Sequence, residues 1–323
     1  MKIIVTGGAG FIGSHVAEAF LGMGHEVLIL DDLSRGKESN MPRGALFDRI
    51  DIAEAALVGQ GRESPLQRLF KSWKPEVVSH HAAQISVRDS VSDPYHDVRT
   101  NAEGTLRLLE ACRANGVNYF IFASTGGALY GEQQHFPARE NHPTYPLSPY
   151  GISKLASEKY LFFYCRQYGL KGMTLRYANV YGPRQDPYGE AGVVAIFCAK
   201  LRDGQTPTIN GDGGQTRDFV YVGDVARANA LALETLAGAH RHATAQNEIN
   251  ISTGLETDVN ELARIIAQIA GSNIEFQHGP PMPGEQRRSV LEPSLALEVL
   301  RWKPEISIVE GLKITWEYFK TQG

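Results

Sequence analysis

The sequence predicts an α/β fold in which a doubly wound parallel sheet carries helices on both faces. Short apolar runs rich in β-branched residues alternate with helical patterns through the first half of the chain, and this alternation is typical of parallel sheets. The first run also leads directly into a glycine-rich turn. At 323 residues the chain exceeds the usual size of one core, so we expect a second, smaller C-terminal α/β lobe.

The glycine-rich turn lies between the apolar run over residues 3–5 and a helical pattern that starts at Ser14. Gly7, Gly10 and Gly13 are spaced by three residues, and Gly8, Gly10 and Gly13 fit the G-x-G-x-x-G spacing. Glycine lets the backbone approach a pyrophosphate, whose charge the free N–H groups of a helix start can bind. The pattern predicts a Rossmann-type dinucleotide site, although an ordinary tight turn also fits it when it is taken alone.

The second apolar run, residues 26–30, favours the dinucleotide interpretation because it ends at Asp31. This carboxylate lies about 20 residues beyond the glycines, where it would hold the hydroxyls of the adenosine ribose. It would also repel a 2′-phosphate, so NAD is favoured over NADP. Arg35 and Lys37 are near enough to serve a 2′-phosphate, or else are solvated loop charges.

Two further runs end in residues that we expect near the cofactor. The run over residues 46–50 ends at Asp51 and Ile52, and Asp51 either meets the adenine or caps the following segment. Small residues after the run over 76–79 would let the cofactor lie against the backbone. They are Ala82 and Ala83, followed by Gln84.

The polar residues around this loop have structural alternatives. His80 and His81 have no partner at metal-ligand spacing, so we expect core or supporting roles rather than metal binding. A helix is predicted over residues 101–115. Asn101 begins it, either as a plain cap or as a polar contact to the cofactor.

The run over residues 119–123 stops at two hydroxyls, Ser124 and Thr125, at the strand end where open α/β sheets bind ligands. A helix that runs to about residue 168 then begins near Tyr150, and Lys154 shares one face with it. A phenol is a poor base at neutral pH, but a neighbouring ammonium lowers its pKa. Tyr150 could then take a proton from an alcohol while Ser124 or Thr125 holds the same oxygen.

Composition excludes several classes of protein. The net charge is −4 with both signs dispersed, so we expect neither nucleic-acid nor membrane binding. No apolar run approaches the length of a membrane span, and the N-terminus enters the nucleotide motif without a signal-peptide pattern. The three cysteines are far apart, which predicts no disulfide or zinc site and a cytoplasmic location.

Several stretches together resemble the extended short-chain dehydrogenase/reductase family, and within it the nucleotide-sugar 4-epimerases of the UDP-glucose 4-epimerase type. They are TGGAGFIGSH at 6–15, LDDLSRG at 30–36, HAAQ at 81–84, STGGALYGE at 124–132, SPYGISK at 148–154, LRYANVYGPRQ at 175–185, GDGGQTRDFVYVGDVA at 211–226 and LRWKPEISIVEGL at 300–312.

The resemblance implies tightly held NAD, a UDP-sugar substrate and a homodimer. It implies an NAD-binding domain over 1–176 plus 218–237 and a nucleotide-sugar domain over 177–217 plus 250–323. The helices that begin near Tyr150 and Asn101 are then candidates for the dimer interface.

The resemblance also assigns residues. Tyr150 becomes the acid/base and Lys154 its partner, while the loop is one residue longer than in many relatives, so the hydroxyl is Thr125 or Ser124. The implied cofactor contacts are Gly7, Gly10, Phe11, Ile12, Gly13, Asp31, Asp32, Ser34, Gly36, Asp51, Ile52, Ala82, Ala83, Gln84, Asn101, Tyr150, Lys154 and Tyr177.

Substrate contacts follow in the same way. Asn179 matches a contact to the diphosphate region, and Arg217 and Arg287 match phosphate ligands; the alternative for each arginine is a surface salt bridge. Val193 and Val194 match the border of the uracil, or are simply core residues. Thr125 and Tyr150 would also contact the sugar.

The reaction class depends on the two residues after Thr125. Related dehydratases carry Asp-Glu there and decarboxylases a Glu, whereas this chain has Gly126 and Gly127. Without these acids we expect oxidation and reduction at C4, that is, epimerisation. Ser289 would leave room for a 2-acetamido group, or merely fills space. A dehydratase, a decarboxylase and a non-catalytic NAD-binding regulator remain as alternatives.

Overall fold

The computed structural model describes residues 1–54, 64–188, 192–238, 248–282 and 286–322. Its centre is a parallel sheet of seven strands in the order β11-β6-β5-β4-β1-β2-β3. The strands are β1 (Lys2–Thr6), β2 (Glu26–Asp31), β3 (Leu46–Arg49), β4 (Val77–His80), β5 (Tyr119–Thr125), β6 (Lys171–Tyr177) and β11 (Glu248–Ile251). The chain order reverses between β1 and β4, which is where open sheets of this kind bind ligands.

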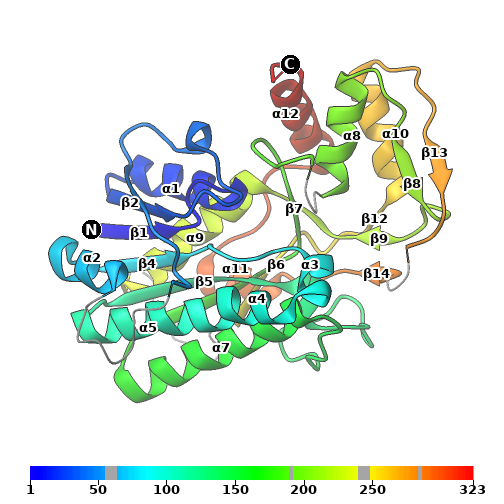
Figure 1. Ribbon diagram of the computed structural model, residues 1–323. Helices are drawn as coiled ribbons and strands as arrows, with labels where there is room; N and C mark the ends of the chain where they lie inside the picture. Colours follow the sequence, from blue (N-terminus) through cyan, green and yellow to red (C-terminus); the bar gives the residue numbers. More distant parts are fainter. Residues whose placement is uncertain (55–63, 189–191, 239–247, 283–285, 323) are drawn as a thin grey trace.

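Helices cover both faces of the sheet, so its strands, apart from the exposed edge strand β3, are buried on both sides (Figure 1). Successive residues of β1 serve opposite cores: Ile3 and Val5 pack with one set of helices and Ile4 with the other. The first set is α1 (Phe11–Gly22), α9 (Val222–Leu236) and α11 (Ser294–Leu300). The second set is α2 (Pro65–Trp73), α5 (Gly104–Asn115) and α7 (Pro149–Tyr168). This burial explains why the strands are nearly continuous apolar runs.

The smaller lobe has its own core beneath three helices, drawn at the upper right of Figure 1. They are α8 (Val193–Arg202), α10 (Val259–Ala270) and α12 (Ile308–Lys320). Its short strands are β8 (Thr208–Asn210), β9 (Thr216–Arg217), β12 (Thr257–Asp258), β13 (Gln277–Gly279) and β14 (Arg288–Ser289). The strands β7 (Asn179–Tyr181) and β10 (Phe219–Tyr221) form a separate parallel pair. In the sequence, each stands where the chain passes from one lobe to the other.

The nucleotide-sugar domain does not begin again at residue 250, as the sequence predicted. Strand β11 pairs with β6 in the large sheet, and Ile249 and Ile251 are fully buried in its core. Helix α11 and Trp302 belong to the same core, and the Trp302 indole donates to the Asp224 carbonyl at 2.9 Å. Residues 248–251 and 294–302 therefore belong to the Rossmann lobe. The chain returns to this lobe at β11 and again at α11.

The prediction that Asn101 begins a helix is also wrong. The helical backbone starts earlier, at α3 (Val87–Ser92) and α4 (Pro94–Val98), and continues through a π-helical turn over Arg99–Glu103 into α5. Asn101 lies inside that turn. A π-helical turn redirects a side chain out of the regular helical register, and here it turns Asn101 towards the loop after β4.

Candidate active site

Glycines shape a cradle between the loops after β1 and β4. A Cβ on Gly7, which has a φ of +67°, would lie 2.6 Å from the Ala82 nitrogen, and one on Gly13 would lie 2.2 Å from the Gly7 carbonyl oxygen. A Cβ on Gly10 would lie 3.1 Å from the same oxygen, which is a milder clash. Phe11 and Ile12 then begin α1 and are half-buried. A side chain would fill this cradle, so the residues present fit a dinucleotide pyrophosphate at the start of α1.

Asp31 fixes the loop after β2 to the glycine turn. Its carboxylate accepts the Ala9 N–H at 3.0 Å and the Leu33 N–H at 2.9 Å, and burial raises its pKa. A Cβ on Gly36 would lie 2.7 Å from the same carboxylate. Asp32 accepts the Ser34 N–H and hydroxyl at 2.8 and 2.6 Å. The loop is thus shaped around the acid that we expect to face a ribose.

The cationic side chains of this loop are paired with carboxylates. Arg35 lies 2.9 Å from Asp89, and Lys37 lies 3.7 Å from Asp186. Both pairs are exposed, so each contributes little to stability. Their arrangement agrees with loop charges rather than with ligands of a 2′-phosphate.

Asp51 closes a turn after β3, and its contact with the adenine stays a prediction. Its carboxylate accepts the Ala53 N–H at 2.8 Å and so closes the turn that follows the strand. Ile52 is buried, and a Cβ on Gly104 would lie 3.1 Å from its Cδ1. Ile52 therefore packs the loop after β3 onto α5.

The loop after β4 is held by Asn101. The Asn101 amide accepts the Gln84 N–H and donates to the Gln84 carbonyl, both at 2.9 Å, and it also donates to buried Asp97 at 2.8 Å. Asp97 in turn accepts the hydroxyl of Ser153 on α7 at 2.6 Å. Asn101 therefore positions Ala82, Ala83 and Gln84 against the cradle and connects them to the helix that carries the Tyr–Lys pair.

His80 is a neutral imidazole that connects β1 to α5 in the core. Its Nδ1 lies 2.7 Å from the Thr6 hydroxyl and its Nε2 lies 2.9 Å from the Thr105 hydroxyl. Since Thr105 donates to the Asn101 carbonyl, His80 Nε2 is the donor to Thr105. Burial lowers the pKa of His80 well below its usual range. Within the described residues no cluster of His, Cys, Asp and Glu could hold a metal ion.

Tyr177 lies under the cradle rather than in it. Only 5% of the residue is exposed, its hydroxyl and the Asn229 amide lie within 2.9 Å, and its ring is stacked 6.5 Å from that of His81. The Tyr177 hydroxyl is thus bonded within the core, and a cofactor contact of Tyr177 stays a prediction. Tyr177 supports the loop after β4 from the core side.

Lys154 is fully buried behind the end of β5. Its ammonium donates to the Ala123 carbonyl at 2.9 Å and lies 4.8 Å from the centre of the Phe122 ring. Burial lowers its pKa to about 8, opposed by the charges of Asp97 and Glu158. Tyr150, four residues earlier on α7, lies in the first helical turn after the cap Ser148. The pair thus shares one helix face, as predicted.

The two candidate hydroxyls occupy different environments. Ser124 donates to buried Glu158 at 2.6 Å, so its hydroxyl belongs to the core. Thr125 is half-buried and accepts the Ala128 N–H at 3.2 Å, which fixes its rotamer at the start of α6 (Gly126–Leu129). A Cβ on Gly127 would lie 3.9 Å from both Thr125 Oγ1 and Asn179 Oδ1. Thr125 and Asn179 therefore border one common space.

Glu158 belongs to an ion pair that sequence reasoning missed. Arg176 donates to its two carboxylate oxygens at 3.0 and 2.7 Å, with side chains 3% and 0% exposed. Arg176 also donates to the Tyr130 hydroxyl at 3.0 Å, which donates to Asn250 at 2.8 Å. Glu158 lies four residues after Lys154 on the same helix face, and this spacing is the signal that could have found it.

Lys154→Met is expected to move the acid limb of the pH–rate profile upwards by about one pH unit or more, because the phenol of Tyr150 loses a neighbouring positive charge. The sign follows from the lowered pKa of Lys154, about 8, since the ammonium form predominates below that pH. The profile is measured with saturating cofactor. Lys159 on the same helix is exposed and lies 3.7 Å from Glu248, so Lys159→Met should leave the profile unchanged. Equal profiles for the parent and Lys154→Met would contradict the role of Lys154 as the charge that favours the phenolate.

Three substrate candidates meet around buried Asp218. The Asp218 N–H donates to the Ser289 carbonyl at 3.0 Å, and its carbonyl accepts the Asn179 N–H at 2.9 Å. Ser289 is also paired with Arg217 between β14 and β9 and is 4% exposed. Asn179, Arg217 and Ser289 are thus brought together although they span more than a hundred positions of the sequence.

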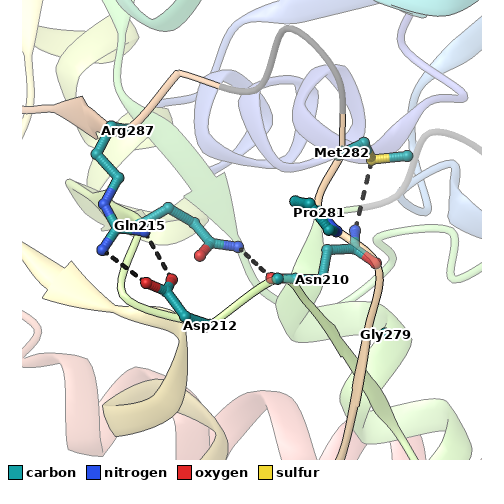
Figure 2. A pocket seen from close by; sticks show the side chains of 8 residues that line it. Asn210, Asp212, Gln215, Gly279, Pro281, Met282 and Arg287 are labelled. Atoms are coloured by element: carbon teal, nitrogen blue, oxygen red, sulfur yellow. Dashed lines mark hydrogen bonds and ion pairs between the residues drawn. The ribbon is translucent and has the colours of Figure 1, made fainter.

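Arg287 adjoins these residues through its backbone, because its carbonyl accepts the Thr216 N–H at 3.0 Å. Its side chain lines a pocket of about 510 Å³ on the smaller lobe (Figure 2). Its guanidinium forms a bidentate ion pair with Asp212 at 2.6 and 3.1 Å, with side chains 64% and 67% exposed. The surface salt bridge, which was the alternative, is what the structure contains. Val194 is fully buried in the core of this lobe, and Val193 is half-buried beside it.

The fold and the site define a nucleotide-dependent α/β enzyme with a Tyr–Lys pair, and comparison with known proteins gives its family. The model of the NAD dependent epimerase/dehydratase family matches residues 3–251. The chain belongs to this family. The predicted Rossmann fold and the use of NAD are thereby confirmed.

Individual relatives are more specific. The chain is 47% identical over 99% of both sequences to a putative UDP-glucose 4-epimerase of Methanocaldococcus jannaschii. It is 48% identical, over 99% of both chains and with a TM-score of 0.92, to a UDP-glucose 4-epimerase of Thermotoga maritima solved with UDP-glucose. A UDP-glucose 4-epimerase of Thermus thermophilus in complex with NAD is 45% identical over both whole chains, with a TM-score of 0.89. The predicted resemblance to NAD-dependent UDP-glucose 4-epimerases is confirmed.

Proposed function

We propose that this protein interconverts UDP-glucose and UDP-galactose by epimerisation at C4. The observation that carries the proposal is the convergence of the glycine cradle, buried Lys154 and fixed Thr125 at the carboxyl end of β5. Asn179, on β7, borders the same space. A sugar that lies there has a cofactor site on one side and an acid/base helix on the other.

Each residue then has a defined part in the reaction. NAD, when bound, supplies reversible oxidation at C4 of the sugar. The phenol oxygen of Tyr150 takes the O4 proton and later returns it, Lys154 stabilises its ionised form, and Thr125 donates a hydrogen bond to O4. Arg217 holds the diphosphate while the oxidised sugar turns, so either face of C4 can receive hydrogen.

The absence of an acid after Thr125 disfavours water elimination or decarboxylation. A Cβ on Gly126 would lie 2.2 Å from Leu291 Cδ1, so no longer side chain fits there without moving Leu291. At Gly127 there is ordinary space, but no proton-carrying group. These two positions therefore supply no proton donor for C5 or C6, which favours exchange at C4.

The test is to incubate the purified protein, without added NAD, with UDP-galactose and to follow the anomeric proton signals by NMR. The expected result is conversion to UDP-glucose until the two reach equilibrium. A 4-keto-6-deoxy product would instead identify a dehydratase. No change of the sugar, despite bound NAD, would contradict the proposal.

Ser289 is proposed to widen the sugar pocket. It is small, buried and beside Arg217, so the protein should also epimerise UDP-N-acetylglucosamine. Ser289→Tyr is expected to lower the kcat/KM for the N-acetylated sugar about tenfold or more relative to UDP-galactose, because a bulky ring excludes the acetamido group. An unchanged ratio of the two kcat/KM values would show that Ser289 merely fills space.

We further propose a homodimer through α4 and α7. These helices are joined by the Ser153–Asp97 hydrogen bond and lie together at the front of Figure 1. The exposed apolar side chains are Tyr95 and Val98 on α4, Ile152, Tyr160 and Phe163 on α7, and Val91 on the neighbouring α3. Exposed apolar side chains on two packed helices favour a protein–protein interface. Light scattering should give twice the 35.5 kDa of one chain, and Phe163→Asp should give the monomer; a parent monomer would contradict the proposal.

In the described part of the chain, no helix has both the length and the apolar character needed to cross a bilayer. Cys112 and Cys198 are buried, and all three cysteines are free thiols. This state supports the proposal of a reducing, cytoplasmic location.

A further inference from the structure

A short loop connects the helix of the cofactor site to the strand that carries Asn179. The loop covers residues 182–186 and runs from the end of β7 towards α8, which belongs to the core of the smaller lobe. Asn179 is the first residue of β7 and borders the same space as Thr125. Contacts that hold this loop therefore also determine where Asn179 lies in the site.

Two consecutive residues of the loop bind α1. The Pro183 carbonyl accepts the Nε2–H of His15 at 3.0 Å, and burial lowers the pKa of His15, so its ring is neutral. Arg184 donates to the Glu18 carboxylate at 2.7 Å and to the Ser14 hydroxyl at 3.4 Å. These partners lie near the start of α1.

The start of α1 is also where the glycine cradle fits a pyrophosphate. Ser14 is fully buried there, and its hydroxyl donates to the Phe11 carbonyl at 3.0 Å. Arg184 is thus bonded to a side chain that is itself fixed in the first turn of the helix. The loop between the lobes is therefore attached directly to the element that we expect to hold the cofactor.

Contacts on two sides hold the loop in its conformation. Arg184 has a φ of +68°, a left-handed backbone that is unfavourable for a residue with a side chain unless its surroundings hold it. A Cβ on Gly182 would lie 2.4 Å from Val222 Cγ1, so the loop turns closely against the start of α9. On the other side, the Arg184 side chain is 22% exposed and pairs with Glu18.

We propose that Arg184 is a positioning residue for the reaction. Through Ser14 and Glu18 it fixes the loop, and with it Asn179, relative to the cofactor site. The placement of the sugar against the cofactor then depends on an ion pair between α1 and the loop. This inference rests on the proposed function, because it requires a sugar and NAD in one site.

The experiment measures kcat for UDP-galactose on the NAD-loaded protein, and the dissociation constant of UDP by calorimetry. Arg184→Gln is expected to lower kcat about tenfold or more, because a small displacement of reacting groups reduces the rate steeply. The affinity for UDP should change by less than about twofold, since the proposed diphosphate ligand Arg217 is unaltered. Arg184→Lys should recover part of the loss, because lysine supplies the charge without the fork.

Glu18 tests the same ion pair from the other side. Glu18→Gln should also lower kcat, although Glu18 is an exposed residue of α1. The double variant of Arg184→Gln with Glu18→Gln should be no slower than Arg184→Gln alone, because both changes remove one interaction. If the two effects multiply instead, the residues act independently and the inference is overturned.

Two control variants separate the side chain from the backbone and from nearby charges. Glycine adopts the left-handed backbone readily, so Arg184→Gly removes the side chain while it relieves the backbone; kcat should fall as in Arg184→Gln, and a retained kcat overturns the inference. Lys37 pairs with Asp186 of the same loop at 3.7 Å, and both are exposed. Lys37→Gln should change kcat by less than about twofold.

The failures of the two proposals are distinguishable. If the parent epimerises the sugar and Arg184→Gln keeps its kcat, the role of Arg184 is overturned while the proposed function stands. The same holds if Arg184→Gln loses affinity for UDP in proportion to kcat, since Arg184 is then a ligand of the substrate. A parent that epimerises neither UDP-galactose nor UDP-N-acetylglucosamine overturns the proposed function, and this inference with it.

Discussion

Tyr150→Phe is expected to lower the rate of epimerisation by about 10²–10⁴, because the phenol that moves the O4 proton is removed. The benzene ring keeps the shape of the side chain, and α7 is capped by Ser148 independently of it. The fold and the NAD content should therefore match the parent. The measurement is the initial rate of UDP-galactose conversion by NMR at several pH values.

Ser124→Ala and Thr125→Val provide the matched pair of controls for this result. Ser124 donates to Glu158 in the core, so its loss should reduce stability by about 1 kcal/mol and leave the rate nearly unchanged. Thr125→Val retains the shape but removes the hydroxyl beside Asn179. It should reduce the rate strongly. If Ser124→Ala were the slower variant, the assignment of the hydroxyl would be reversed.

Arg176→Met is expected to lower the free energy of unfolding by about 3–5 kcal/mol, since it leaves the Glu158 carboxylate buried without its charged partner. The two side chains are 3% and 0% exposed, so water cannot replace the guanidinium. The shift of the urea midpoint at constant slope measures the effect. Arg113→Met, which breaks an exposed ion pair, should shift the midpoint far less.

A double variant separates the pair from its surroundings. Glu158→Leu together with Arg176→Met removes both charges and should recover much of the loss, because an apolar pair of similar volume replaces a buried ion pair at small cost. If the double variant is as unstable as Arg176→Met alone, the loss comes from the wider hydrogen bonds to Tyr130 and Asn250.

Local sequence patterns predicted the strands and their ends well. Buried parallel strands are continuous apolar runs, and polar or glycine residues stop them, so Asp31, Thr125 and the glycine turn lie where such breaks predict. The fixed spacing of Tyr150 and Lys154 placed them on one helix face for the same reason, since i and i+4 are neighbours on any helix.

Long-range pairing could not be predicted in this way. Nothing in the local sequence of β11 indicates that this strand pairs with β6, roughly seventy residues earlier, at the edge of the large sheet. Nor does local pattern show that Arg287 meets Asp212, or that Arg88 reaches across to Met282. A charged side chain has several partners within reach, and only the tertiary path of the chain selects one.

The burial of Lys154 has a thermodynamic consequence for the whole fold. Its pKa is about 8 in the native protein, against about 10.4 in an unfolded chain. The unfolded state therefore binds more protons between these values, and stability rises with pH across that interval. Below pH 8 the buried ammonium of Lys154 lowers the free energy of unfolding by its full amount, about 3 kcal/mol from the difference between the two pKa values. The ammonium that prepares the phenol for proton transfer thus makes the native state less stable at neutral pH, and the packed sheet offsets this loss.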